Sequence, residues 1–211
     1  MHRRPTTALA AIAVVLTATA CGSSSTAKPG ASKPSAQSST TSSTPQPAGV
    51  DPNAPEVVAP GDIPDTQAFV PYTAAGYSFS VPEGWSRTVA GSTTTFSDHY
   101  NSIAAVSAPV AVAPTVASVQ ATEVPILQRN VANFELVKVA SVTRTAGPAI
   151  LVTYRAGSAP NPVTGKRVAI DVERYEFWHN GTLVTLTLSG ARGSDNVDPW
   201  KKVTNSFAWT A

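Results

Sequence analysis

Residues Val168–Ser189 read VAIDVERYEFWHNGTLVTLTLS, and this stretch decides the fold class. Two runs rich in β-branched and aromatic residues flank Asn180-Gly181, a dipeptide that strongly favours a two-residue β-hairpin turn. Such a turn pairs Phe177 with Val184 and carries the same register outward along both strands. The sequence therefore predicts two long antiparallel strands joined by a tight turn.

The apolar residues of the first of these strands change faces partway along it. An unbroken register places Glu173 opposite Leu188 on the buried face. Val172 and the apolar residues before it then point to the opposite face. A one-residue bulge near Glu173-Arg174 would bring Val172 opposite Leu188. We therefore predict a bulged hairpin.

Further runs of alternating or β-rich residues predict more strands. With the two hairpin strands, the predicted set is Gly76–Val81, Thr93–Ser97, Ser102–Ala108, Phe134–Thr143, Ala149–Ala156, Val168–Trp178 and Leu183–Ser189.

A helix is predicted over Thr115–Val131, with Pro125 expected to break or kink it. Its apolar positions can share one face, namely Val116, Val119, Ile126, Leu127 and Val131.

A second helix is predicted near the end of the chain. Ser194 or Asp195 can cap it, and Asp198 and Pro199 suit its first turn. One apolar stripe runs along it, formed by Val197, Trp200, Val203 and Phe207. Strands, a helix, more strands and a final helix predict an α+β fold, an antiparallel β-sheet flanked by helices.

Composition divides the chain into three parts. Residues 66–211 are rich in Val, Ile, Leu and aromatic residues and suit one domain of ordinary size. Residues 21–65 are nearly all Ser, Thr, Ala, Pro and Gly, with too few large apolar side chains to offset the entropy of ordering. We expect a disordered linker over residues 21–65 and a signal peptide over residues 1–20.

The first 20 residues have the order of a secretion signal: Arg3-Arg4, an apolar run over Ala8–Leu16, and small residues before Cys21. Bacterial lipoprotein signals have this form, with the cysteine acylated and the signal cut in front of it. The apolar run is shorter than the about 20 residues that a membrane-spanning helix needs. An ordinary secretory signal with a free cysteine is the alternative, which a lone thiol in an oxidising compartment disfavours. We predict lipid attachment at Cys21 on the extracytoplasmic face of the cell membrane.

The charge balance excludes a strongly basic protein. The chain has 15 Lys and Arg against 13 Asp and Glu, and removing Arg3 and Arg4 with the signal leaves 13 against 13. A nucleic-acid-binding protein needs a concentrated basic face, so we expect no nucleic-acid partner. Cys21 is the single cysteine, so we expect no disulfide and no thiolate metal site.

No pattern of catalytic or metal-binding residues stands out in the sequence. His99 and His179 lie far apart, and each is interpreted as a turn or surface histidine. Neighbouring Ser97, Asp98 and His99 do not predict a triad, because consecutive strand residues point to opposite faces. We expect no enzymatic activity, no metal and no cofactor.

Two arginines are candidate contacts to a ligand or partner. The predicted bulge could aim Arg174 into a cleft between sheet and helix, although a solvated sheet face is favoured. Arg192 lies in a glycine-containing turn before the last helix, where backbone amides could bind an anion. A plain connection is favoured there, since Asp195 and Asp198 occupy the place of an anion.

Several segments carry a resemblance to a known family, namely Gly76–Trp85, Gly147–Ala149, Asp195–Trp200 and Ser206-Phe207. On these segments the domain resembles the actinobacterial LpqN-type lipoproteins, whose folded part is PsbP-like. The resemblance implies an antiparallel sheet between helices. It also implies a binding or assembly role, because members of this fold mostly act in that way and no catalytic motif carries over.

Three classes of function remain open. The first is a surface-tethered adaptor that binds a protein partner in the cell envelope. The second is a carrier of a small apolar or lipid ligand, which needs an apolar cavity between the sheet and the helix over Thr115–Val131. The third is an enzyme, which needs convergent polar residues that the sequence does not show. We predict the first.

Overall fold

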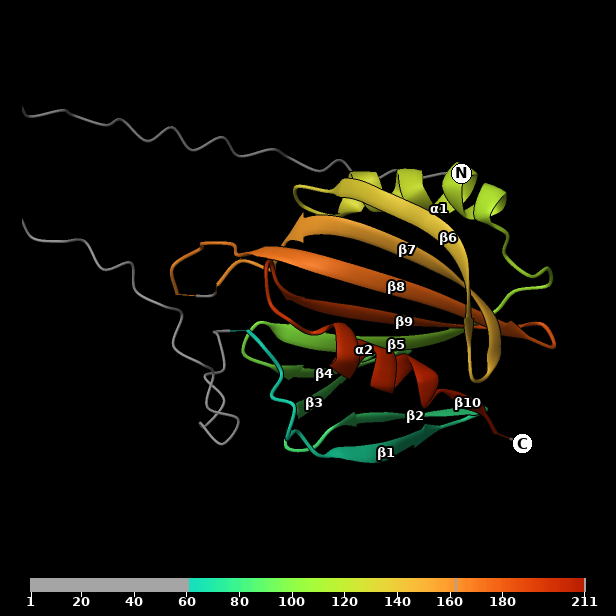
Figure 1. Ribbon diagram of the computed structural model, residues 1–211. Coiled ribbons are helices and arrows are strands. Elements are labelled where there is room, and N and C mark those ends of the chain that lie inside the picture. Colours follow the sequence, from blue (N-terminus) through green and yellow to red (C-terminus); the bar gives the residue numbers. More distant parts are fainter. Residues whose placement is uncertain (1–60, 162, 211) are drawn as a thin grey trace, which may run out of the picture. The chain divides into compact units, whose positions relative to one another are not determined.

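A seven-stranded antiparallel sheet forms the centre of the structure, a computed structural model that describes residues 61–161 and 163–210 (Figure 1). Its spatial order is β3-β4-β5-β9-β8-β7-β6. The strands are β3 (Ser86–Ala90), β4 (Thr93–Asp98), β5 (Asn101–Pro109), β6 (Glu135–Arg144), β7 (Gly147–Gly157), β8 (Ala169–His179) and β9 (Thr182–Ala191). The predicted signal peptide, Cys21 and residues 22–60 of the predicted linker lie outside the described residues.

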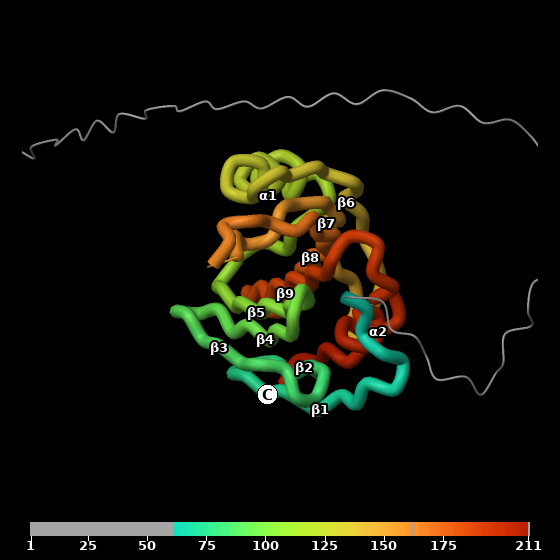
Figure 2. The backbone as a smooth tube through the Cα atoms, turned by 90° about the vertical axis from the view of Figure 1, so that its left-hand side faces the viewer, coloured from blue at the N-terminus to red at the C-terminus, as the bar shows by residue number. Residues whose placement is uncertain are grey.

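A small second sheet and two helices cover this large sheet. The small sheet has the order β1-β2-β10, with β1 at Phe69–Ala74, β2 at Tyr77–Pro82 and β10 at Ala208–Trp209. Helix α1 (Val116–Asn130) lies over one face of the large sheet, and helix α2 (Val197–Asn205) lies on the opposite side together with the small sheet (Figures 1 and 2). The predicted α+β fold, an antiparallel sheet flanked by helices, is confirmed.

The large sheet buries side chains on both faces, which gives the domain two apolar cores. On the side of α2, Phe177 of β8 stacks on Phe207 with ring centroids 4.1 Å apart. On the side of α1, Val119 of the helix packs with Val152 and Val172 of the sheet. A sheet that is covered on both faces has apolar residues of both parities along one strand.

The predicted bulge in the hairpin is therefore wrong. The register of β8 and β9 runs without interruption, with Glu173 opposite Leu188 and Arg174 opposite Thr187. Val172 has the other parity because it belongs to the core under α1. Glu173 is accommodated on the opposite face because its Oε2 accepts a hydrogen bond from the Tyr175 hydroxyl at 2.7 Å.

Helix α1 begins as predicted and continues through Pro125 as one element, so the expected break is absent and a kink at Pro125 stays a prediction. A capping box starts it: the Thr115 hydroxyl accepts from the backbone N–H of Ser118, and the Ser118 hydroxyl accepts from the backbone N–H of Thr115. Ile126 was expected on the buried face but is 48% exposed. Val124 packs toward the sheet instead, because it lies nearer the middle of the helical stripe.

Helix α2 also differs from expectation at its start. Its N-cap is Asn196, not Ser194 or Asp195, and Val197 is 70% exposed. The Asn196 side chain does not cap the helix, because its Oδ1 accepts a hydrogen bond from the backbone N–H of Ile63 at 2.8 Å. The rest of the predicted stripe is confirmed: Trp200, Val203 and Phe207 are buried.

Residues 61–65 belong to the folded domain, although the sequence assigned them to the linker. Ile63 is 5% exposed and lies in the core beside α2. The Gly61 carbonyl accepts hydrogen bonds from the side-chain amides of Asn101 and Asn196, at 2.9 and 3.0 Å. The folded part therefore starts several residues before the predicted boundary at residue 66.

Neither helix in the described part of the chain is long and apolar enough to cross a bilayer.

Candidate functional site

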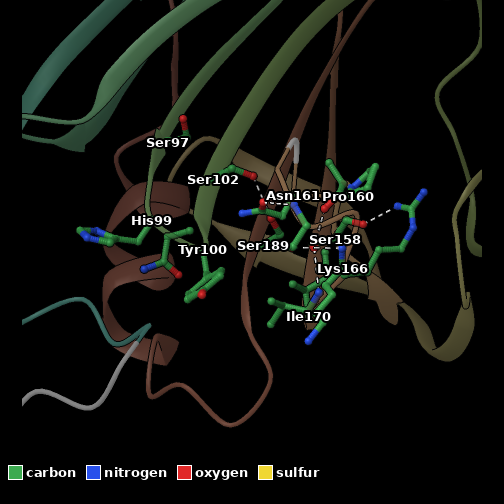
Figure 3. A pocket seen from close by; sticks show the side chains of 15 residues that line it. Ser97, His99, Tyr100, Ser102, Ser158, Pro160, Asn161, Lys166, Ile170 and Ser189 are labelled. Atoms are coloured by element: carbon green, nitrogen blue, oxygen red, sulfur yellow. Dashed lines mark hydrogen bonds between the residues drawn. The ribbon is translucent and has the colours of Figure 1, made fainter. Parts of the chain in front are cut away.

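A groove of about 590 Å³ opens at one end of the large sheet, between the β4–β5 turn and the loop that joins β7 to β8 (Figure 3). We call it the polar groove. Its lining residues are Ser97, His99, Tyr100, Asn101 and Ser102 on the first wall, Ser158, Ala159, Pro160, Asn161, Thr164, Lys166, Arg167, Val168 and Ile170 on the second, and Ser189 between them.

The first wall is a tight turn with an exposed aromatic residue. His99 adopts a φ of 47°, which turns the chain sharply between β4 and β5. Its Nδ1 lies 2.9 Å from Asp98 Oδ2, and its ring points away from the second wall (Figure 3). Tyr100 is 49% exposed. His99 is thus a surface turn histidine, as predicted, and Ser97, Asp98 and His99 do not form a triad.

The floor of the polar groove is held by hydrogen bonds between neighbouring strands. The hydroxyls of Ser102 on β5 and Ser189 on β9 lie 2.8 Å apart. Asn101 is buried, and its Oδ1 accepts from the Asn196 side-chain amide at 3.0 Å. Since Asn101 also donates to the Gly61 carbonyl, the floor is connected directly to the first described residue of the chain.

The second wall carries two basic side chains. Lys166 and Arg167 precede β8, and the guanidinium of Arg167 donates to the Ser158 carbonyl. Asn161 shapes the loop, because its Oδ1 accepts from the backbone N–H groups of Val163 and Thr164, both at 2.9 Å. Among residues 61–161 and 163–210, neither basic side chain has an acidic partner within 4.0 Å. The wall therefore presents uncompensated positive charge beside hydroxyl and amide groups.

Arg174 does not lie in the polar groove. It projects toward α1, where its Nε and Nη2 donate to the two carboxylate oxygens of Glu123, each at 3.1 Å. Its Nε also lies 3.5 Å from Glu176 Oε1, and its side chain is 19% exposed. Arg174 thus links the sheet to the helix, and its role as a partner contact stays a prediction.

Arg192 lies after β9 and forms a loose surface ion pair. Its Nε is 3.7 Å from Asp171 Oδ1, and its backbone N–H donates to the Ala169 carbonyl at 2.9 Å. The glycine-containing turn, for which a plain connection is favoured over an anion site, thus carries an arginine that already faces a carboxylate. Its contact role likewise stays a prediction.

Sequence reasoning missed the polar groove. Its two walls are about 60 residues apart in the chain, and each is an ordinary polar loop when considered alone. Lys166 and Arg167 are neighbours in the sequence, and nothing in their local pattern indicates that they line a groove. Within the described residues, no group of three or more His, Cys, Asp or Glu side chains is placed to hold a metal ion.

Several solved structures have folds similar to that of this chain, whereas no family model and no curated protein matches it. PsbP from the cyanobacterium Synechocystis sp. PCC 6803 has 18% identity and a TM-score of 0.49, over 73% of this chain and 99% of that one. LpqN of Mycobacterium tuberculosis, described as involved in cell envelope biogenesis, has 14% identity and a TM-score of 0.42, over 70% of this chain and 93% of that one. The Ran-binding protein Mog1p of Saccharomyces cerevisiae has 11% identity and a TM-score of 0.45, over 67% and 95%. These likenesses concern the fold alone, and the LpqN-type assignment stays a prediction.

Proposed function

We propose that this chain is a non-enzymatic adaptor of the cell envelope, attached by a lipid at Cys21 to the outer face of the cytoplasmic membrane. In this proposal the polar groove binds an acidic, extended segment of another envelope protein. Lys166 and Arg167 attract the carboxylates of that segment, and the hydroxyls and amides of the groove bond to its backbone.

One observation carries the proposal, namely the uncompensated positive charge of the second wall in a chain whose mature charge is balanced. Thirteen basic and thirteen acidic residues remain after the predicted signal, so this local excess is not a consequence of overall basicity. Tyr100 supplies a large exposed ring at the opposite wall. Tyrosine and arginine side chains are enriched at the surfaces on which proteins bind each other.

The carrier hypothesis has less support from the packing. That hypothesis needs an apolar cavity between the sheet and α1, but six buried side chains occupy that space: Val119, Ile150, Val152, Tyr154, Ala156 and Val172. Val152 is fully buried, and Val119 and Val172 are each 2% exposed. A lipid could enter there only by displacing a packed core, which costs free energy.

Cross-linking in intact cells, followed by mass spectrometry of the membrane-extracted protein, tests this proposal. The wild-type chain is compared with a variant that reverses the groove charge, Lys166→Glu with Arg167→Glu. Lys138→Glu with Lys201→Glu makes the same charge change at exposed positions outside the groove and is the control. We expect one dominant partner for wild type and control and its loss from the groove variant. An equal yield of that partner from all three chains contradicts the proposal.

A further inference from the structure

A second, smaller opening lies at the other end of β8, between the segment that precedes α1 and the hairpin of β6 and β7. Its volume is about 180 Å³. We call it the Glu176 slot; its main lining residues are Ala113, Pro114, Ser141, Ile150, Glu176 and Trp178. The indole N–H of Trp178 donates to the Val110 carbonyl at 2.7 Å, which holds the segment before α1 against the end of β8.

Glu176 is the unusual member of this lining. Its side chain is 1% exposed, yet its Oε1 accepts no hydrogen bond within the described residues. Arg174 Nε lies 3.5 Å from that oxygen, but the guanidinium is already bonded to both carboxylate oxygens of Glu123. A buried polar atom without a partner is costly, and native proteins rarely leave one. Glu176 also lines the slot, so a donor bound in the slot would lie beside its carboxyl group.

Burial and the neighbouring charges keep Glu176 mostly protonated at pH 7. Burial, reinforced by the facing carboxyl of Glu123, raises the pKa of Glu176 to about 8. Burial alone would raise the pKa of Glu123 as well, but hydrogen bonds from Glu176 and Arg174 hold it below its usual value. Tyr154 of β7 faces the same cluster, and burial raises its pKa, so it also stays neutral. Glu123 and Arg174 therefore neutralise each other, and Glu176 keeps its proton until a further cation approaches.

The other lining residues of the slot indicate the chemical class of that cation. Ala113, Pro114, Ile150 and the ring of Trp178 present apolar surface that suits a short alkyl chain. An aromatic ring also attracts a cation placed over its face. Because the oxygen without a partner belongs to a carboxyl group, an N–H donor with positive charge forms the strongest bond to it.

We propose that the Glu176 slot binds a primary alkylammonium group, with Glu176 accepting a hydrogen bond from its nitrogen. A lysine side chain of a partner protein or a free amine could supply this group. Binding moves the proton of Glu176 to solvent, so an ammonium enters, a carboxylate forms and one proton leaves. The site is separate from the polar groove, and neither proposal depends on the other.

Calorimetric titration of the full chain with n-butylammonium at pH 7, in phosphate and in Tris, tests this proposal. The two buffers take up protons with different enthalpies, so the difference in heat counts the protons released. We expect saturable binding, release of nearly one proton and no binding of neutral n-butanol. Equal binding of n-butanol, or binding without proton release, contradicts the proposal.

Three variants locate the site. Glu176→Gln cannot form a carboxylate, so it should weaken binding by about tenfold or more. Glu83→Gln, at an exposed carboxylate, should bind as wild type. Ser141→Phe fills the slot from an exposed position and should also abolish binding with the buried acid intact. Unchanged binding by Glu176→Gln and Ser141→Phe overturns the assignment.

A lysine-containing peptide and its Nε-acetylated form distinguish the two sources. Binding of the free peptide but not of the acetylated one assigns the slot to a protein partner. Binding of n-butylammonium but of neither peptide assigns it to a free amine. Both results support an ammonium site, and saturable binding of the acetylated peptide alone contradicts it.

Discussion

At the scale of single residues, buried polar side chains decide which parts of this domain are held firmly. Asn101 and Asn196 are both at most 5% exposed, and their amides bond to each other and to the Gly61 carbonyl. These bonds join β5, the start of α2 and the first described residues. Glu176 is the contrasting case, because Arg174 offsets only part of the free-energy cost of burying its carboxyl group.

Glu176 predicts a specific pH dependence of stability. The pKa of Glu176 is about 8 in the native state, whereas the unfolded chain loses this proton near 4.5, the ordinary pKa of a glutamate. The native state thus binds more protons between these values, so this group lowers the free energy of unfolding as pH rises from about 4.5 to about 8. Glu176→Gln should remove that decline. Melting temperatures measured from pH 5 to pH 9 should separate most at the alkaline end. The exposed Glu83→Gln control should follow wild type, and parallel curves for wild type and Glu176→Gln contradict this account.

Asn196 gives a second prediction at this scale. Asn196→Ala leaves the backbone N–H of Ile63 without its acceptor and removes one donor from the Gly61 carbonyl. We expect a loss of about 1–3 kcal/mol in the free energy of unfolding, the usual cost of buried groups left unpaired. Urea denaturation measures it, with Gln128→Ala on the exposed face of α1 as control. A loss no larger than that of the control would show that these bonds contribute little.

At the scale of elements, the sequence predicts the long strands and both helices well because their apolar periodicity is local. Three strands were missed, β1, β3 and β10. All five residues of β3 are exposed, so it carries no alternation of buried and exposed positions, and β10 has only two residues. The parity change along β8 was misinterpreted as a bulge, because one strand does not reveal that helices will cover both faces of its sheet.

The candidate site was harder to predict than the fold, for a physical reason. The polar groove forms where the β4–β5 turn meets the loop before β8, and loops carry no periodicity that signals which of them will be neighbours. Arg174 is a candidate because of the predicted bulge and Arg192 because of the glycine-containing turn, yet both face carboxylates of the same domain. Register and strand order, which depend on the whole sheet, determine those contacts.

Helix α1 yields a prediction about Pro125. Proline in a helix interior removes one backbone hydrogen bond and crowds the preceding turn, yet α1 continues through it because its other face packs on the sheet. Pro125→Ala should therefore raise the free energy of unfolding by about 1–3 kcal/mol. Thermal unfolding measures the gain, with Pro160→Ala in an exposed loop as control. A loss of stability in Pro125→Ala would mean that the proline shapes α1 to fit the sheet.

At the scale of the whole molecule, two proposed binding sites lie at opposite ends of β8. Ile170 lines the polar groove and Trp178 lines the Glu176 slot, so about 26 Å of strand separates these two residues at roughly 3.3 Å a residue. Gly61, the first described residue, lies beside the floor of the polar groove, where its carbonyl accepts a hydrogen bond from Asn101. If both proposals hold, a partner bound at one end of β8 leaves the site at the other end free.

The predicted anchor is tested by Cys21→Ser. Without its thiol the chain cannot carry a diacylglyceryl group, so it should move from the membrane fraction to the soluble fraction and lose the acyl mass. Two or more buried acyl chains are needed for stable attachment. The domain should unfold at the same temperature as wild type, since residue 21 is 40 positions before the first described residue. Retention of the variant in the membrane fraction contradicts lipid anchoring at Cys21.

The most direct test of the proposed function is site-specific photo-cross-linking in intact cells. A photoreactive phenylalanine analogue is placed at Tyr100 in the polar groove, or at Val89 on β3, which is 62% exposed and outside the groove. We predict that the probe at Tyr100 captures one envelope protein in high yield and that the probe at Val89 does not. Capture of that protein from Val89 but not from Tyr100 would contradict the assignment of the polar groove as the surface that binds the partner.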